Sequence, residues 1–243
     1  MSWPQQPAIC EINAWTWLDG LGRANGKTVT LAEVPEREWD ELAGWGLDAV
    51  WLMGVWERSP RGVEIARSHA GLQEEYRRAL PDFTPGDVVG SPYAVRRYEV
   101  DARLGGREGL AWARRALALR GMRLIADFVP NHTATDHPWV EGRPDYYIPG
   151  QPHGSDPYFP PWTDTTQLNA ASPVYRRAAI ETLLDIASRA DGVRCDMAML
   201  LLSQVFAQTW GERPATEFWG EVIADVREKR PDFLFLAEAY WDL

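Results

Sequence analysis

Four charged residues lie at the ends of apolar segments, where charge is hard to accommodate. Asp127 belongs to RLIADFVP, Arg194 and Asp196 belong to GVRCDMAML, and Glu238 follows FLFLA. A buried charge is costly unless it is paired, so packing alone does not account for these residues. Arg194 and Asp196 are two positions apart and therefore point to the same face of a strand. We expect the four side chains to form one polar site, which is either catalytic or, as the alternative, a structural ion-pair network.

A pair of carboxylates next to an arginine suits a retaining glycosidase. In such an enzyme one ionised carboxylate attacks the anomeric carbon, and the second donates a proton to the leaving oxygen and later acts as a base towards water. Arg194 favours the charged form of Asp196, because a nearby cation stabilises a carboxylate. The apolar run before Glu238 predicts a dry environment for this residue, which suits the acid.

Apolar runs that alternate with helical segments must position these residues. Residues 8–18 alternate partly and predict a first strand, and continuous apolar runs, typical of strands covered on both faces, lie at 47–55, 123–130, 192–200 and 233–240. Between them the composition predicts helices at 36–46, 71–83, 107–120, 173–190 and 216–229. Repeated strand–helix units favour a parallel sheet. In parallel barrels the active site lies at the carboxyl ends of the strands, where the four charged residues stand.

Residues 131–172 interrupt this alternation. The stretch is rich in Pro, Gly, Asp and aromatic residues. A loop of that length inside a compact domain usually serves function. We therefore expect it to contribute to the site and not only to connect two elements.

Composition limits the class of partner. The chain has 243 residues, of which 45% are apolar and 25% charged, as in an ordinary soluble globular protein. Its formal net charge of −10 does not favour nucleic acid or an anionic membrane as a partner and is compatible with a neutral substrate. The N-terminus shows no signal-peptide pattern, and no apolar run approaches the roughly 18–20 residues of a membrane span. We predict a cytoplasmic protein without nucleic-acid or membrane partners, and its oligomeric state stays open.

Three segments resemble conserved regions of a known family. DFVPNH (127–132), GVRCDMAM (192–199) and AEAYWD (237–242) are similar, in order and in placement on strands three, four and five, to regions of the α-amylase family, glycoside hydrolase family 13. TTQLN (165–169) resembles the QPDLN region of that family, and residues 90–106 resemble the segment that precedes its second helix. The resemblance covers nearly the whole chain.

The resemblance implies an α/β fold of the (β/α)8 TIM-barrel type, truncated after about strand five. Residues 1–130 would hold strands one to three, residues 131–172 a domain-B-like insert after strand three, and residues 173–243 strands four and five. A fourth conserved region of the family, a His-Asp pair after strand seven, is absent from the sequence. We therefore expect a fragment that lacks activity by itself and tends to aggregate, because an open sheet exposes an edge and a face.

The resemblance also implies roles for the charged residues. Asp196 resembles the catalytic nucleophile of the family, and Glu238 resembles its general acid/base. Arg194 resembles the residue that orients Asp196 and keeps it charged, and Asp127 resembles the structural carboxylate that pairs with the region of this arginine. Asp196 and Glu238 are thus the predicted catalytic residues, and Arg194 and Asp127 belong to the predicted substrate site.

Other matching residues concern the substrate and a metal ion. His132 resembles a histidine that hydrogen-bonds the sugar beside the cleaved bond, and Tyr93 resembles a tyrosine stacked under that sugar. Asn131 matches a position that binds calcium in many amylases, but Gln167 replaces the calcium-binding aspartate of the QPDLN-like region. No cofactor is therefore predicted, with calcium at Asn131 as the alternative.

The predicted function is that of a retaining glycoside hydrolase or transglycosylase that acts on an α-glucan or α-glucoside through a covalent glycosyl-enzyme. The two reactions differ only in whether water or a sugar hydroxyl attacks the intermediate, and the sequence leaves both open. The alternative is a catalytically inactive fragment or a binding module with an amylase-like fold. A metal-dependent barrel hydrolase is disfavoured, because its first strand would need an HxH pair that CEINAWTW lacks.

Overall fold

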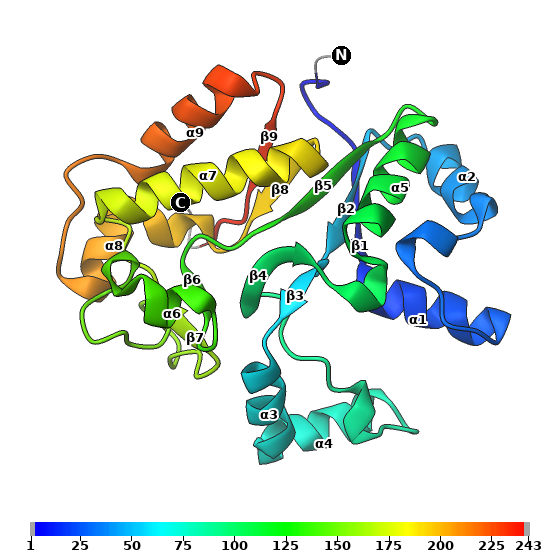
Figure 1. The fold of residues 1–243 in the computed structure, drawn as a ribbon, viewed down its shortest axis with the longest axis horizontal. Coiled ribbons are helices and arrows are strands. Elements are labelled where there is room, and N and C mark those ends of the chain that lie inside the picture. Colours follow the sequence, from blue (N-terminus) through cyan, green and yellow to red (C-terminus); the bar gives the residue numbers. More distant parts are fainter. Residues whose placement is uncertain (1–2, 241–243) are drawn as a thin grey trace.

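The computed structural model describes residues 3–240, and its centre is a parallel sheet of five strands (Figure 1). Trp241 and Asp242, which end the motif AEAYWD, lie outside the described residues. The predicted parallel α/β sheet is confirmed, but within residues 3–240 each outer strand has only one neighbour, so the sheet is open and not a closed barrel. In spatial order the strands are β1 (Ile9–Asn13), β2 (Ala49–Met53), β5 (Arg123–Phe128), β8 (Gly192–Cys195) and β9 (Leu234–Ala237), and all neighbours are parallel.

Helices connect the strands and cover one face of the sheet. Figure 1 shows α2, α5, α7 and α9 following one another along it. Buried side chains at alternate strand positions, such as Leu52, Leu124 and Val193, pack in the core beneath these helices. The helices of the main body are α1 (Ala14–Asn25), α2 (Glu36–Gly44), α5 (Gly106–Ala118), α7 (Pro173–Arg189), α8 (Ser203–Trp210) and α9 (Phe218–Lys229).

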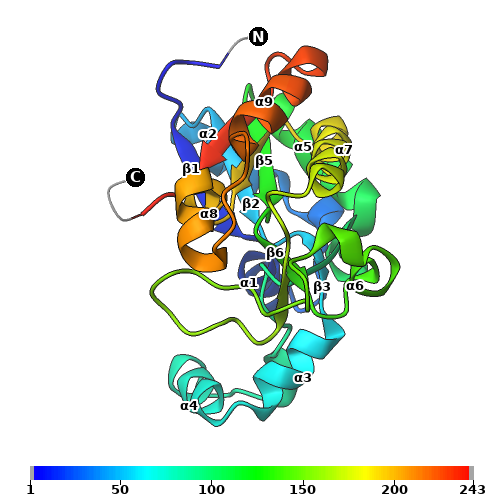
Figure 2. The ribbon, with the colours of Figure 1, turned by 90° about the vertical axis from the view of Figure 1, so that its left-hand side faces the viewer.

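Two small antiparallel sheets and three further helices lie beyond the carboxyl ends of the five strands, which point downward in Figure 1. Figure 2 shows the long loop between α6 and β7 projecting from the body of the molecule. These elements surround the carboxyl ends of the strands, where the predicted site residues lie. Their bounds are β3 (Trp56–Arg58), α3 (Pro60–Ser68), α4 (Ala70–Ala79), β4 (Val95–Val100), β6 (His132–Ala134), α6 (Pro138–Gly142) and β7 (Thr165–Gln167), and short 3₁₀ turns lie at Leu31–Glu33, Pro85–Asp87, Ala102–Leu104, Pro144–Tyr146 and Ala198–Leu201.

The prediction of a strand over residues 8–18 is wrong beyond Asn13, where α1 begins. The Oδ1 atom of Asn13 accepts hydrogen bonds from the backbone amides of Trp15 and Thr16, at 3.1 and 3.4 Å. A side chain that satisfies the free amides of a first turn favours the start of a helix. The buried residues Ala14, Leu18 and Leu21 then follow helical spacing, which the partial alternation concealed.

The segment at 192–200 is likewise a strand only as far as Cys195. Met197 has a φ of 44°, a left-handed conformation that is uncommon outside glycine. A 3₁₀ turn, Ala198–Leu201, follows at once. The chain therefore leaves the sheet directly after Asp196, and this turn sets the direction of the groups that follow it.

The helices α3 and α8 were not predicted. The start of α3 carries a readable signal in WERSP, because the Oγ atom of Ser59 accepts the amide of Gly62 at 2.7 Å and Pro60 takes the first helical position. None of the helices within residues 3–240 combines the length and the apolar character needed to cross a bilayer.

Candidate active site

The face of the sheet opposite the core helices carries every predicted charged residue. In the strand register Asp127 on β5 is the partner of Arg194 on β8, and Arg194 is the partner of Leu236 on β9. Two positions further along the same face, Asp196 follows β8 and Glu238 follows β9. The parallel register therefore brings three strand ends together at one edge of the sheet.

Arg194 stands at the centre of this group. Its Nη1 atom lies 2.7 Å from Oδ1 of Asp196, and its Nη2 atom lies 2.5 Å from Oε2 of Glu238. The guanidinium also lies 5.0 Å from the ring centroids of both Trp51 and Tyr93, within the range of cation–π attraction. Its side chain is 8% exposed. One largely buried cation thus holds both predicted catalytic carboxylates.

Asp196 is buried at the end of β8. Its backbone amide donates to the carbonyl of Phe128 at 2.8 Å, which ties the residue to β5. Burial raises the pKa of Asp196, Arg194 opposes that shift, and the charge of Glu238 adds to it. Arg194 therefore favours the charged form of Asp196, in the direction expected from the sequence, but burial outweighs it and the net shift of the pKa is upward.

Glu238 is surrounded by donors. The amide of Met197 donates to Oε2 at 2.8 Å, the hydroxyl of Tyr240 donates to Oε1 at 2.6 Å, and Arg194 completes the set. The amide of Glu238 itself donates to the carbonyl of Cys195 at 3.1 Å, so the residue is tied to the end of β8. The dry, apolar environment predicted for Glu238 is therefore wrong.

Asp127 is fully buried, and its oxygens meet two donors that the sequence did not identify. The indole of Trp51 donates to Oδ1 at 2.9 Å, and the amide of Gly54 donates to Oδ2 at 2.7 Å. Trp51 lies on β2, and the alternation of that strand places it on the same face as Asp127, which was a signal that could have found this donor. Gly54 follows β2 directly. Asp127 is also the strand partner of Arg194, and the charge of that arginine opposes the rise of its pKa. Burial raises the pKa of Asp127 to about 6.

Tyr93 and His132 lie beside this group. Burial raises the pKa of the Tyr93 hydroxyl well above its usual range, so the phenol is a neutral hydrogen-bond donor at neutral pH. Burial also lowers the pKa of His132 to about 4, against an opposing hydrogen bond to the backbone of Tyr93. The imidazole is therefore uncharged at neutral pH. Its ring lies 5.1 Å from the ring of Trp162, which belongs to the segment between β6 and β7.

The residues at the expected calcium position do not fit a calcium ion as they stand. The Nε2 atom of Gln167 donates to both the backbone oxygen and the Oδ1 atom of Asn131, each at 2.9 Å. Calcium requires oxygen ligands at about 2.3–2.6 Å. Here the amide nitrogen of Gln167 already contacts the two oxygens of Asn131 that would be the calcium ligands. Over residues 3–240 no group of three or more His, Cys, Asp or Glu side chains is arranged to hold a metal.

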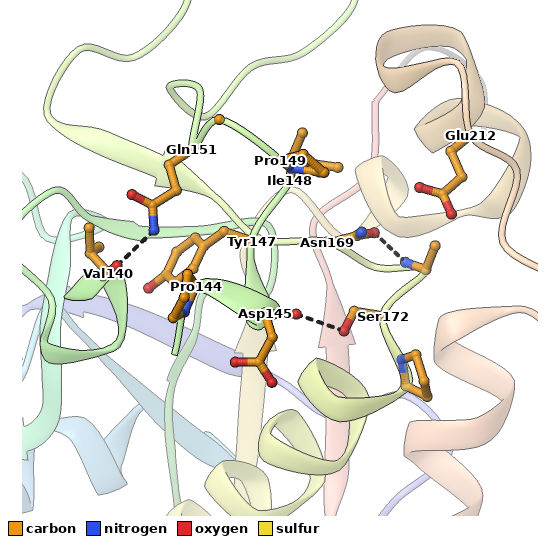
Figure 3. Close-up of a pocket in the computed structure, with 13 residues that line it drawn as sticks. Val140, Pro144, Asp145, Tyr147, Ile148, Pro149, Gln151, Asn169, Ser172 and Glu212 are labelled. Carbon is orange, nitrogen blue, oxygen red and sulfur yellow. Dashed lines mark hydrogen bonds between the residues drawn. The ribbon is translucent and has the colours of Figure 1, made fainter. Parts of the chain in front are cut away.

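One large hollow of the surface lies away from these carboxylates. It has a volume of about 880 Å³ and lies on the segment between β6 and α7, with Glu212 on its rim (Figure 3). Its polar side chains are largely engaged: Gln151 donates to the carbonyl of Val140 at 2.7 Å, and Ser172 donates to the carbonyl of Asp145 at 3.0 Å. No predicted site residue lines it. Volume alone therefore does not identify the site, and the strand-end carboxylates remain the candidate.

Comparison with known proteins relates the chain to several enzymes and to one transport protein. No family model matches the chain. It is 27% identical over 214 residues to an α-1,4-glucan:maltose-1-phosphate maltosyltransferase from Pseudomonas aeruginosa, a match that covers 84% of this chain and 29% of that protein. It is 33% identical over 105 residues to an amino acid transporter heavy chain from Mus musculus, a match that covers 40% of this chain and 14% of that protein.

The fold is also similar to that of solved structures. An α-amylase from Lactobacillus plantarum superposes with a TM-score of 0.66 at 21% sequence identity, and the match covers 96% of this chain and 45% of that one. The chain therefore spans less than half of this solved protein and less than a third of the matched transferase.

Proposed function

We propose that this chain, which resembles the α-amylase family in both sequence and fold as its motifs predicted, carries the carboxylate pair of a retaining enzyme acting on an α-glucan or α-glucoside. The observation that carries the proposal is the shared cation, since Arg194 contacts Asp196 and Glu238 with its two terminal nitrogens. A shared guanidinium favours the short carboxyl separation of retaining enzymes, roughly 5–5.5 Å, over the longer separation of inverting ones.

Each carboxylate would have a distinct task in this reaction. Asp196, in its ionised form, attacks the anomeric carbon as the bond to the leaving oxygen breaks, and Glu238 gives its proton to that oxygen. Glu238 then takes a proton from water or from a sugar hydroxyl, and the oxygen that loses the proton displaces Asp196 from the sugar. Water gives hydrolysis and a sugar hydroxyl gives transfer, and both stay within the proposal.

The substrate class rests on the relatives and on charge. The matched transferase is named for an α-1,4-glucan, and a chain with a net charge of −10 suits a neutral sugar better than a polyanion. His132 and Tyr93 are neutral at neutral pH and can donate or stack without attracting charge. Both would contact the sugar held next to Asp196.

The boundaries and the location belong to the same proposal. Residues 131–172 would be a domain-B-like insert between barrel portions 1–130 and 173–243, because β6, α6 and β7 lie between β5 and α7. A cytoplasmic location remains a prediction from the sequence.

A binding module is the second candidate, and one observation favours it. Glu238 is held by an ion pair and two further hydrogen bonds, an arrangement suited to a fixed structural carboxylate. One matched relative is named as an amino acid transporter heavy chain. In this case the same face of the sheet would bind a glucan and leave it intact.

Incubation with maltoheptaose, followed by chromatography of the products, separates these candidates. The sequence alone predicts a chain without activity, but Asp196 and Glu238 already share Arg194 in this structure. The proposal therefore predicts shorter products for hydrolysis, or longer ones for transfer, from the full chain and from the control Asp225→Asn, which changes an exposed helical carboxylate. Asp196→Asn should give neither. Equal product from Asp196→Asn would refute the proposal. Glucan binding without any product would support the binding module instead.

A further inference from the structure

The side-chain amide of Gln167 occupies the centre of an oxygen-lined position. Gln167 is fully buried on β7. Its Nε2 atom lies 2.9 Å from the backbone oxygen of Asn131, 2.9 Å from Oδ1 of Asn131 and 3.0 Å from the backbone oxygen of Leu168. Three oxygens from two separate segments of the chain thus converge on one nitrogen atom.

The other end of the same amide is also bound. The Oε1 atom of Gln167 accepts from Nδ2 of Asn131 and from the backbone amide of Ser155, each at 3.2 Å. Asn131 and Gln167 therefore form a reciprocal amide pair. All distances at Gln167 are those of ordinary N–H···O hydrogen bonds, so every buried polar atom of this side chain has a partner.

Three converging oxygens present negative potential, and an uncompensated cluster of this kind is costly in a buried place. A hard cation can compensate them, but it needs shorter contacts and more ligands. The amide of Gln167 brings two N–H groups to the same point without charge and without a desolvation cost for an ion. The amide thereby adds to the backbone hydrogen bond from Leu168 to the carbonyl of Asn131, at 3.0 Å, which also joins β7 to the end of β5.

The amide pair also reaches His132. The Nδ2 atom of Asn131 lies 3.3 Å from Nδ1 of His132. An amide nitrogen can only donate, so Nδ1 accepts, and a neutral imidazole then carries its proton on Nε2. The hydrogen bond between the imidazole and the backbone of Tyr93 also acts on this ring. Asn131 is oriented for this contact by the hydrogen bonds that its own amide makes with Gln167.

We propose that Gln167 is both a substitute for a cation and a positioning residue: its amide nitrogen fills the oxygen-lined position, and through Asn131 it holds the proton of His132 on Nε2. The segment would then need no calcium for its stability. That the Nε2 proton serves a bound sugar rests on the proposed function, but the cation substitution and the tautomer do not.

Thermal unfolding tests the substitution. The full chain should unfold at the same temperature in EGTA and in about 5 mM CaCl2, which exceeds even weak calcium dissociation constants of roughly 10⁻³ M. Gln167→Glu places a carboxylate among the three oxygens, so it should unfold at a lower temperature in EGTA and recover in CaCl2, as a bound ion stabilises the folded state. The control Gln204→Glu makes the same change on an exposed helical position and should not respond.

Imidazole ¹⁵N chemical shifts test the positioning role. His132 of the native chain should show a protonated Nε2 and an unprotonated Nδ1, and Gln167→Met, which keeps the length but loses the amide, should show a mixture of both tautomers. Calcium stabilisation of the native chain, or a native His132 protonated on Nδ1, would overturn the proposal even if neither variant folds. An unchanged tautomer in a folded Gln167→Met would overturn the positioning role. None of these readouts requires activity, so they stand apart from a failure of the proposed function.

Discussion

Arg194 and Glu238 form an ion pair in which Nη2 of the guanidinium lies 2.5 Å from Oε2 of the carboxylate. The pair links neighbouring strands, because Arg194 belongs to β8 and Glu238 follows β9. The other terminal nitrogen of the same guanidinium holds Asp196. Both carboxylates therefore share one cation.

Removal of that cation should destabilise the chain strongly. Arg194→Met leaves Asp196 and Glu238 close together without their shared partner, and loss of one member of a buried ion pair costs about 3–5 kcal/mol. Urea unfolding at neutral pH would measure this loss. The side chain of Arg37 is 71% exposed and forms a surface ion pair with Glu38. The control Arg37→Met should therefore change stability by less than about 1 kcal/mol. Equal stability of the two variants would mean that Arg194 is not the shared support described above.

The raised pKa of Asp127 predicts a specific pH dependence. Its pKa in the folded state is about 6 against an ordinary value of 3.8, so between these values the folded state binds more protons than the unfolded state. The stabilising contribution of Asp127 is then complete below pH 4 and is lost as the pH rises through 6, by up to about 3 kcal/mol.

Asp127→Asn lacks this titration and provides the reference. The unfolding free energy of the native chain minus that of the variant should fall steadily between pH 4 and pH 7, whatever the other groups contribute to both proteins. Guanidinium chloride unfolding at intervals across that range would show it. A difference that grows with pH would mean that Asp127 is stabilised in its charged form, contrary to its fully buried setting.

The close approach of β8 and β9 depends on Gly192. A Cβ atom there would lie 2.8 Å from Cβ of Leu234 and 3.0 Å from its backbone oxygen. Gly192→Ala should therefore push the strands apart and cost about 1–3 kcal/mol. The control Gly44→Ala adds a methyl group in α2 where nothing lies within 4 Å, and it should be neutral or stabilising by up to about 1 kcal/mol. Thermal unfolding of both variants would measure the contrast, and a Gly192→Ala variant as stable as the native chain would contradict it.

Two exposed aromatic residues should extend the binding of a longer glucan. Tyr158 and Phe159 are each 64% exposed, and Oδ1 of Asp156 accepts both of their amides, at 2.7 and 3.0 Å, which fixes the turn that presents them. Trp162 of the same loop contacts His132. The double variant Tyr158→Ala and Phe159→Ala should weaken maltoheptaose binding about tenfold, or about 1.4 kcal/mol.

Calorimetric titration with maltoheptaose and with maltose would separate this role from a general loss of structure. Maltose is too short to span both places, so its affinity should stay unchanged in the double variant. The control Trp45→Ala removes an aromatic side chain that is 60% exposed. Trp45 precedes β2 and therefore lies towards the amino ends of the strands, opposite to the candidate site. A loss of maltoheptaose affinity as large in Trp45→Ala as in the double variant would show that the loop has no specific part.

The sequence could place the charged residues but not their partners. A period of two along a strand is local, so Arg194 and Asp196 could be assigned to one face from their spacing alone. One donor to Glu238, the amide of Met197, depends on the left-handed turn at that residue, which no local pattern indicated. The contacts of Gln167 with Asn131 span 36 positions, and only the pairing of β6 with β7 brings them together.

The covalent intermediate at Asp196 tests the central claim most directly. Treatment with 5-fluoro-α-D-glucosyl fluoride, followed by mass spectrometry of peptic fragments, should show one added fluoroglucosyl group on the peptide that contains Asp196, and none in Asp196→Asn. An unmodified Asp196 peptide in the native chain, or a group attached to another residue, would contradict the account.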